Sequence, residues 1–261
     1  MASSARYDGA VLRVTVLELP ATWGDPQAAL AAVDIELRRG PETDLVLLPE
    51  ASLSGYVSAT GTFDLAAFAE PIDGPTARAV AALARRHRVH LVAPLVLDER
   101  GSGRFNAMVG FDRDGARTFA YRKRHPWFPE TWATAGELPA PTVVIEGVRV
   151  TIAVCFDVHF VAEDAAHALD AADLLLFPSA WVEEEDSRAT MLPALARRHR
   201  IAVANANWAP GLVRIAGQGG SSILDASGAV LASVTPRVMR ADAVVSADLR
   251  RGADPKVELA E

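Results

Sequence analysis

Two short runs of apolar residues limit the folds that this chain can adopt. The run LVLL at residues 45–48 and the run DLLLF at residues 173–177 are apolar at nearly every position, so as strands they are apolar on both faces. A strand of this kind must be covered on both sides. Two sheets that pack together, with helices on their outer faces, satisfy this requirement. The chain is therefore predicted to be an α/β protein.

Helix and strand patterns alternate along the chain, but not in a simple one-to-one order. Helices are predicted at residues 25–40, 74–89, about 162–172 and about 185–199. Strands are predicted in segments 10–19, 44–50, 90–97, 104–123, 141–157, 173–181, 201–208, 221–233 and 242–249, with hairpin turns at Asp114-Gly115, Glu146-Gly147 and Gly228. Eight clean strand–helix units cannot be counted, which argues against a TIM barrel.

The boundaries of the first helix are marked by residue types that favour helix ends. Asp25 stands at the N-cap position, Pro26 at the first helical position and Gly40 just past the end. The sequence therefore predicts both ends of this helix.

The composition excludes several functional classes. Of 261 residues, 50% are apolar and 23% are charged, which allows a filled core and a charged surface. The net charge of −7 argues against a nucleic-acid partner, because binding nucleic acid needs a basic surface.

One cysteine cannot form an internal disulfide, and this indicates a reducing compartment. With no signal peptide and no membrane-spanning run recognised, we expect a cytoplasmic protein without a membrane partner. We expect a single domain over residues 1–261, with loosely held termini at about 1–8 and 250–261.

The only cysteine, Cys155, ends a segment with strand-like alternation. In VRVTIAVC it shares a face with two small residues, Thr151 and Ala153, which leave room for a ligand. A lone free cysteine is usually buried and inert, and a nucleophile needs a base or a positive charge nearby. Asp157 can accept hydrogen bonds in the following turn, and His159 would allow a cysteine–histidine hydrolase. No histidine pair has metal-ligand spacing with a third ligand, so no metal site is predicted.

Three other side chains are candidates for the same chemistry. Glu50 follows the apolar strand DLVLLPE, where partial burial would raise its pKa toward that of a general base; a solvated loop glutamate is the alternative. Lys123 shares a face with two aromatic residues in FAYRK and would stabilise an oxyanion, unless the basic run is only solvated. In the loop PWFPETW, Trp127 would line a pocket and Glu130 would hold the lysine, or the loop would serve in packing or at an interface.

The order of these segments resembles that of a known family. LLPEASLSGY, YRKRHPWFPE, IAVCFD, ADLLLFPSAW, RRHRIAVANANW and GQGGSSILDASGAVLA together resemble the nitrilase superfamily of carbon–nitrogen hydrolases, over essentially the whole chain. KRHPWFPETW resembles the corresponding segment of the aliphatic amidases, although it is one residue shorter. The resemblance implies a four-layer α-β-β-α sandwich that assembles into a homodimer or a higher homo-oligomer.

The resemblance also implies a Glu-Lys-Cys triad. Carried onto the matching positions, Glu50 is the general base, Lys123 stabilises the oxyanion and Cys155 is the nucleophile. The family's second glutamate falls on Glu130, and Glu137 is the competing assignment. The reaction passes through a thioester on the cysteine and needs no metal or organic cofactor.

The residues after the cysteine set the expectation for the substrate. His159 stands where relatives that cleave N-carbamoyl amino acids carry an arginine, and a buried carboxylate lacks its partner without that arginine. We therefore expect a small neutral or basic carboxamide in contact with His159, Trp127 and Trp181, with the Phe156 backbone N–H at the oxyanion. A purely structural role of His159 is the alternative. Hydrolysis of a nitrile or an N-carbamoyl compound by the same triad is the alternative, and a non-catalytic scaffold of the same fold is a further one.

Overall fold

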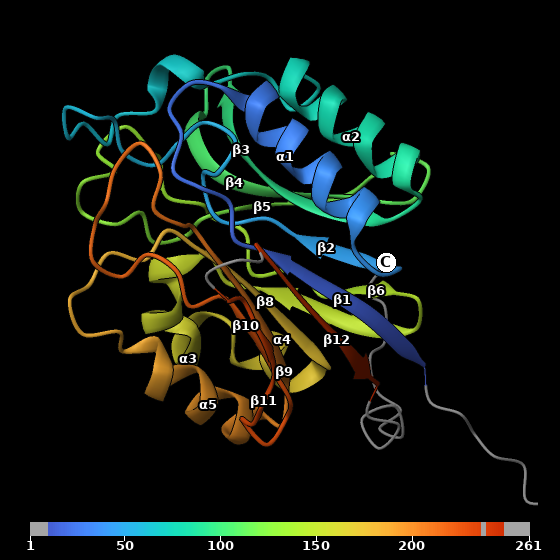
Figure 1. Ribbon diagram of the computed structural model, residues 1–261. Coiled ribbons are helices and arrows are strands. Elements are labelled where there is room, and N and C mark those ends of the chain that lie inside the picture. The colour runs from blue at the N-terminus through green and yellow to red at the C-terminus, as the bar shows by residue number, and fades with distance from the viewer. Residues whose placement is uncertain (1–9, 236–238, 248–261) are drawn as a thin grey trace, which may run out of the picture.

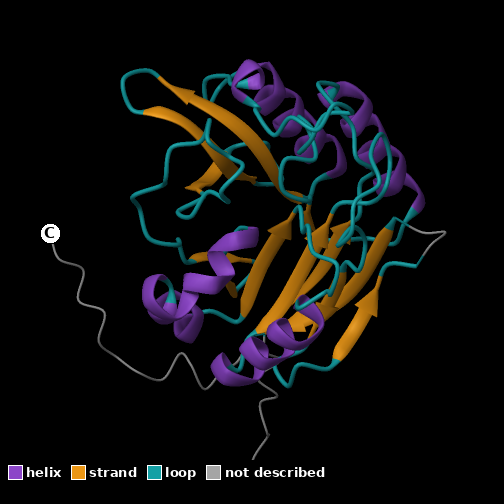
Figure 2. Cartoon of the chain, turned by 90° about the vertical axis from the view of Figure 1, so that its left-hand side faces the viewer, coloured by secondary structure: helices purple, strands orange, loops and turns teal. Residues whose placement is uncertain are grey.

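Two six-stranded sheets lie face to face in the computed structural model, which describes residues 10–235 and 239–247. Helices cover the outer face of each sheet, and Figure 2 shows the resulting layers from the side. This arrangement confirms the predicted α-β-β-α sandwich. The termini that were predicted to be loosely held, at about 1–8 and 250–261, lie outside the described residues.

The first sheet is built mainly from the N-terminal half of the chain. Its strands, in spatial order, are β12 (Arg240–Ser246), β1 (Val11–Leu17), β2 (Leu45–Leu47), β3 (His90–Glu99), β4 (Gly103–Phe111) and β5 (Arg117–Arg122). The three strands β1, β2 and β3 are parallel, and the others are antiparallel to their neighbours. The helices α1 (Pro26–Arg39) and α2 (Pro75–His87) cover the outer face of this sheet (Figure 1).

The second sheet repeats this plan with the rest of the chain. Its strands, in spatial order, are β11 (Val230–Ser233), β10 (Ser222–Leu224), β9 (Ala202–Asn207), β8 (Leu174–Ser179), β7 (Val148–Ile152) and β6 (Val143–Ile145). Its outer face carries α3 (Val161–Asp164), α4 (Ala166–Ala171) and α5 (Arg188–His199) (Figure 1). In the part of the chain that the structure describes, no helix has the length and apolar character needed to span a membrane.

Both faces of the LVLL run are covered, as the sequence predicts. Leu45 and Leu47 belong to the apolar cluster shared with the second sheet, whereas Val46 and Leu48 belong to the cluster beneath α1 and α2. Burial of each such side chain contributes about 1.5–3 kcal/mol to the free energy of unfolding. The layered fold therefore follows directly from this pattern.

Both ends of α1 lie where the sequence predicts them, but Gly40 does not adopt the left-handed conformation that is common after a helix. The Asp25 side chain accepts a hydrogen bond from the Ala28 N–H at 2.9 Å, and Pro26 occupies a position that needs no N–H donor. Gly40 follows the helix in an extended conformation, with φ of −83°. A Cβ atom there would lie 2.1 Å from a guanidinium nitrogen of Arg240, so close packing is the reason for glycine.

Three predicted boundaries differ from the structure, two of them for a local backbone reason. The helix predicted at about 162–172 is interrupted at Ala165, whose φ of −130° is not helical, and so forms α3 and α4. The strand predicted to reach Cys155 ends at Ile152 instead. Cys155 has a φ of +47°, which a strand does not accommodate. The helix predicted from about 185 begins at Arg188.

Candidate active site

The side chains that the sequence singled out lie close to strand ends. Glu50 comes three residues after β2, Lys123 directly follows β5, and Cys155 comes three residues after β7. Ala180 directly follows β8, which neighbours β7. Because the carboxyl ends of parallel strands meet at one edge of a sheet, segments that are distant in the sequence reach the same region.

Glu50, Lys123 and Glu130 form a buried ion-pair network. The Lys123 Nζ atom donates to Glu50 Oε1 at 2.7 Å and to Glu130 Oε1 at 2.8 Å. Glu50 and Lys123 are 0% exposed and Glu130 is 2% exposed. Glu137 is exposed, so the glutamate that contacts the lysine is Glu130.

Two polar side chains that the sequence did not single out complete this network. Asn106 Nδ2 donates to Glu50 Oε1 at 2.8 Å, and the Tyr56 hydroxyl donates to Glu130 Oε1 at 2.9 Å. Asn106 lies inside the apolar strand β4, and an amide in such a strand needs buried partners. That pattern, RFNAMVGF, was a signal that would have found it. Tyr56 lies in a loop and has no comparable signal.

Asp157 holds the turn that carries Cys155. Its Oδ2 atom accepts from the Val154 N–H at 3.1 Å and from the Tyr121 hydroxyl at 2.9 Å. Its Oδ1 atom accepts from the His125 N–H at 2.9 Å. The positive φ of Cys155 is costly for a residue with a side chain, and these bonds to a buried carboxylate keep the turn in place.

The surroundings of Cys155 favour the protonated thiol. Burial raises its pKa and the Glu50 charge raises it further, while Lys123 and the Ala180 backbone N–H lower it only in part. Burial lowers the pKa of Lys123, but Glu50 and Glu130 outweigh that effect and hold the pKa above its usual value. The lysine is therefore an ammonium ion at neutral pH. A base is needed to take the thiol proton when the sulfur reacts.

A cavity of about 190 Å³ opens at Cys155. It is lined by Tyr56, Trp127, Cys155, Phe156, His159, Ala180, Trp181, Val182 and Glu183. All four residues predicted to contact the substrate (Trp127, Phe156, His159 and Trp181) are on this list. Tyr56 and Glu183 are cavity residues that the sequence did not reveal. A cavity of about 260 Å³ beside the start of α2 contains none of the candidate catalytic residues.

Comparison with known families agrees with this geometry. Residues 13–252 match the family model for carbon–nitrogen hydrolases. The chain belongs to the carbon–nitrogen hydrolase family. The matched range includes Glu50, Lys123, Glu130 and Cys155 and confirms the resemblance seen in the sequence.

Relatives of this carbon–nitrogen hydrolase include amidases. The chain is 29% identical to "Hydrolase in pqqF 5′region" of Pseudomonas protegens, over 85% of this chain and 78% of that protein. It is 26% identical to 2-oxoglutaramate amidase of Bacillus subtilis, over 84% and 85% of the two chains. The structure of an amidase from Nesterenkonia sp. superposes with a TM-score of 0.78 at 26% identity and 97% coverage of both chains. A variant of the Nesterenkonia sp. AN1 amidase carries an acrylamide adduct at its active-site cysteine.

Among residues 10–235 and 239–247, this carbon–nitrogen hydrolase has no cluster of three or more His, Cys, Asp or Glu side chains suited to a metal ion. Lys123 is paired with both Glu50 and Glu130.

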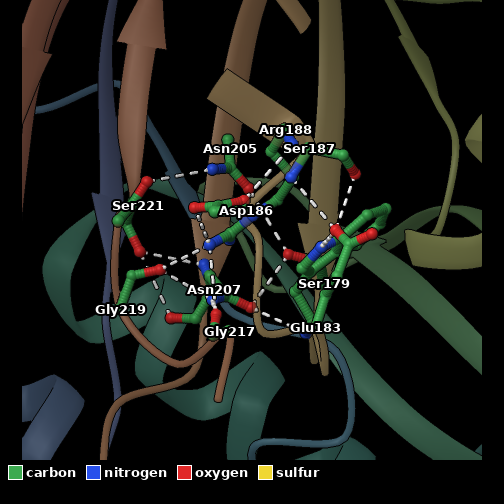
Figure 3. Close-up of polar contacts among 12 residues, drawn as sticks. Ser179, Glu183, Asp186, Ser187, Arg188, Asn205, Asn207, Gly217, Gly219 and Ser221 are labelled. Carbon is green, nitrogen blue, oxygen red and sulfur yellow. Dashed lines mark hydrogen bonds and ion pairs between the residues drawn. The ribbon is translucent and has the colours of Figure 1, made fainter. Parts of the chain in front are cut away.

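A second polar network supports the segment that follows β8 (Figure 3). Asn207 Oδ1 accepts from the Ser179 hydroxyl and from the Trp181 N–H, both at 3.0 Å. Its Nδ2 atom donates to two backbone carbonyls of the loop 217–219, at 2.8 and 2.7 Å. Ala180 lies between Ser179 and Trp181, and its N–H donates to Glu50 Oε2 at 2.9 Å. Asn207 thus helps this hydrolase to fix the position of that carboxylate.

Gly55 provides a test of the loop that carries Tyr56. Its φ is +87°, and a Cβ atom would lie 2.1 Å from the Thr22 carbonyl oxygen. We expect Gly55→Ala to lower the free energy of unfolding by more than about 3 kcal/mol. Gly61→Ala is the matched control, because its φ is +83° but no atom lies within 4 Å of the added Cβ. It is expected to cost only about 1–2 kcal/mol. Equal losses in urea denaturation would contradict the role of the clash.

Proposed function

We propose that the protein is a thiol-dependent amidohydrolase that cleaves a non-peptide C–N bond of a small carboxamide. The observation that carries this proposal is the fully buried ion pair between Glu50 Oε1 and Lys123 Nζ, which lie 2.7 Å apart. Both charges act on the pKa of the Cys155 thiol, and Cys155 lines the cavity. Burial of several charged groups together costs free energy unless they are paired and hydrogen-bonded to one another. The amidase names of the relatives support the reaction class.

In the proposed reaction, Glu50 takes the proton from Cys155 as the sulfur attacks the amide carbon. The electron pair of the C=O double bond moves to oxygen, and N–H donors of Lys123 and of the Phe156 backbone stabilise this oxyanion. The C–N bond then breaks, the leaving nitrogen receives the proton from Glu50, and ammonia or an amine departs. A water molecule deprotonated by Glu50 attacks the thioester, the C–S bond breaks, the sulfur regains its proton and the acid leaves.

The hydrogen-bonding capacity of Lys123 supports its role at the oxyanion. An ammonium group has three N–H donors. Within the described parts of the chain, two of these donors bind Glu50 and Glu130. The third remains for the substrate oxygen, so stabilising the oxyanion does not require either carboxylate to be released.

Release of ammonia from a panel of small amides, nitriles and N-carbamoyl compounds tests the proposal. We expect hydrolysis of at least one neutral or basic amide, with a thioester adduct on the Cys155 peptide in mass spectra of the trapped enzyme. Hydrolysis of nitriles or N-carbamoyl compounds alone would favour the alternative substrate classes with the same triad. If no compound is hydrolysed and iodoacetamide does not label Cys155, a non-catalytic scaffold is favoured.

The role of Glu50 as general base predicts a large effect of Glu50→Gln. A carboxamide cannot take up the thiol proton, and we expect kcat to fall by about 10²–10⁴-fold. The decrease should appear in single-turnover acylation as well as in the steady state. Circular dichroism should show whether the variant is folded, and a folded variant that acylates at the wild-type rate would exclude Glu50 as the base.

We also propose a homo-oligomeric assembly and a cytoplasmic location. The assembly rests on the resemblance to the family, and light scattering after size exclusion tests it. The location rests on the need to keep the single cysteine reduced. Cell fractionation with an antibody against the chain tests that expectation.

A further inference from the structure

The cavity wall carries one acidic side chain. Glu183 is one of the nine residues that line the cavity, and the pKa of its carboxyl group is held below the usual value. None of the nine residues is a lysine or an arginine. The hydrogen bonds from Ser187 are the main cause of that low pKa. Glu183 is therefore ionised at neutral pH. A substrate with a carboxylate group would meet this charge without a guanidinium or ammonium partner on the wall.

The position of Glu183 is fixed by its own hydrogen bonds (Figure 3). Its Oε2 atom accepts from the Ser187 hydroxyl at 2.7 Å, from the Ser187 N–H at 3.0 Å and from the Trp181 indole N–H at 2.8 Å. All three bonds go to the same oxygen. The other oxygen, Oε1, has no hydrogen-bond donor among the residues that the structure describes, and there Glu183 makes no ion pair. One anionic oxygen is thus available to a ligand.

The basic side chains near Glu183 do not neutralise it. Arg188 pairs with Asp186 through Nε at 2.7 Å and Nη2 at 2.8 Å, and its guanidinium lies 5.8 Å from the Trp181 ring centre. The charge interaction with His159 lowers the pKa of Glu183, but the His159 ring faces Trp181, with ring centres 5.9 Å apart. Among the described residues, His159 makes no hydrogen bond to this carboxylate. The carboxylate therefore lacks a fixed counter-ion.

The rest of the wall suits an alkyl chain that ends in a cation. Tyr56 and Trp127 stack with ring centres 6.4 Å apart, and Phe156 and Trp181 also face the cavity. Aromatic faces bind ammonium groups through their quadrupoles and bind methylene groups through apolar contact. The volume of about 190 Å³ equals about six water molecules at about 30 Å³ each, so the ligand must be short.

We propose that the preferred substrates are short carboxamides that carry a protonated amino group, with Glu183 as the counter-ion of that group. This inference rests on the proposed function, because it places the amide carbon at Cys155 and the ammonium group at Glu183. The cationic end is selected by a charge-assisted hydrogen bond to Oε1, and the chain between the two ends lies along the aromatic wall.

Three matched sets of amides test the proposal. The cationic set is glycinamide, β-alaninamide and 4-aminobutanamide, and the neutral set is propanamide, butanamide and pentanamide. The anionic set is malonamate, succinamate and glutaramate. We expect the best cationic amide to exceed its neutral counterpart in kcat/KM by about tenfold, and to exceed the anionic one by more.

Glu183→Gln should remove this preference. The glutamine oxygen can still accept from Trp181 and Ser187, so the wall keeps its shape while the charge is lost. We expect the kcat/KM for the cationic amide, divided by that for its neutral counterpart, to fall to a value between about 1 and about 3. Glu184→Gln is the matched control, since Glu184 is exposed, does not line the cavity and removes the same charge one residue away. It should keep the wild-type ratio.

The same comparison in a Cys155→Ala background separates this inference from the proposed reaction. Calorimetric binding of the three sets does not depend on turnover. Tighter binding of cationic amides that is lost with Glu183→Gln supports the ammonium site, even if no amide is hydrolysed. A wild-type preference for neutral or anionic amides, equal effects of the Glu183 and Glu184 substitutions, or no binding of any cationic amide would overturn it.

Discussion

Replacing Cys155 with alanine is expected to abolish amide hydrolysis and to leave the fold intact. No other thiol is present in the chain, so neither the thioester nor a substitute for it can form. Loss of the nucleophile should lower kcat by at least about 10⁴-fold, which is the scale seen when a catalytic nucleophile is removed. Ammonia release, followed over long incubations with purified variant, measures the residual rate.

The fold of the Cys155→Ala variant is predicted to survive for local reasons. Alanine accepts a φ of +47° no worse than cysteine does. The hydrogen bonds that the Asp157 carboxylate accepts from the His125 and Val154 N–H groups do not involve the sulfur. The change in melting temperature should therefore be small, and circular dichroism should be unchanged. A folded variant that still releases ammonia at the wild-type rate would rule out Cys155 as the nucleophile.

The sequence predicted the layers and singled out both residues of the buried Glu50–Lys123 ion pair, because both depend on local patterns. The LVLL and DLLLF runs demand cover on both faces, and Glu50 and Lys123 each stand at the end of a recognisable strand. No comparable pattern marks Glu183. It begins a run of four acidic residues, and hydrogen bonds from Trp181 and Ser187, two and four residues away, hold it at the cavity wall.

The turn at Cys155 could not be predicted from the alternation of its segment. The alternating pattern continues to residue 155, but the strand stops at Ile152 because the carboxylate of Asp157 binds the Val154 N–H and holds a turn. This bond spans only three residues, and it overrides the strand propensity that the alternation indicates. Asn106 is a different case, since a single amide in an apolar strand is a local signal of buried partners that was missed.

Replacing Lys123 with methionine is expected to cost both activity and stability. The variant keeps much of the side-chain volume but leaves Glu50 and Glu130 buried without the ammonium group that both carboxylates bind. Breaking a buried ion pair in this way typically costs about 3–5 kcal/mol. Loss of the oxyanion donor should lower kcat by about 10²–10³-fold. Arg104→Met is the control, because it removes an exposed cation and introduces the same residue.

The loss of stability in the Lys123→Met variant should depend on pH in a defined direction. Burial already raises the pKa of Glu130 above 4.5, and Lys123 is the main influence that lowers it, so the variant should raise this pKa further. A carboxyl group whose pKa is higher in the folded state stabilises the protein below its unfolded pKa, and that stabilisation is lost as the pH rises through the folded value. In urea denaturation, the variant should therefore lose more stability than wild type as the pH rises above about 4.5. If wild type, Lys123→Met and Arg104→Met all follow the same pH dependence, Lys123 does not lower the pKa of Glu130.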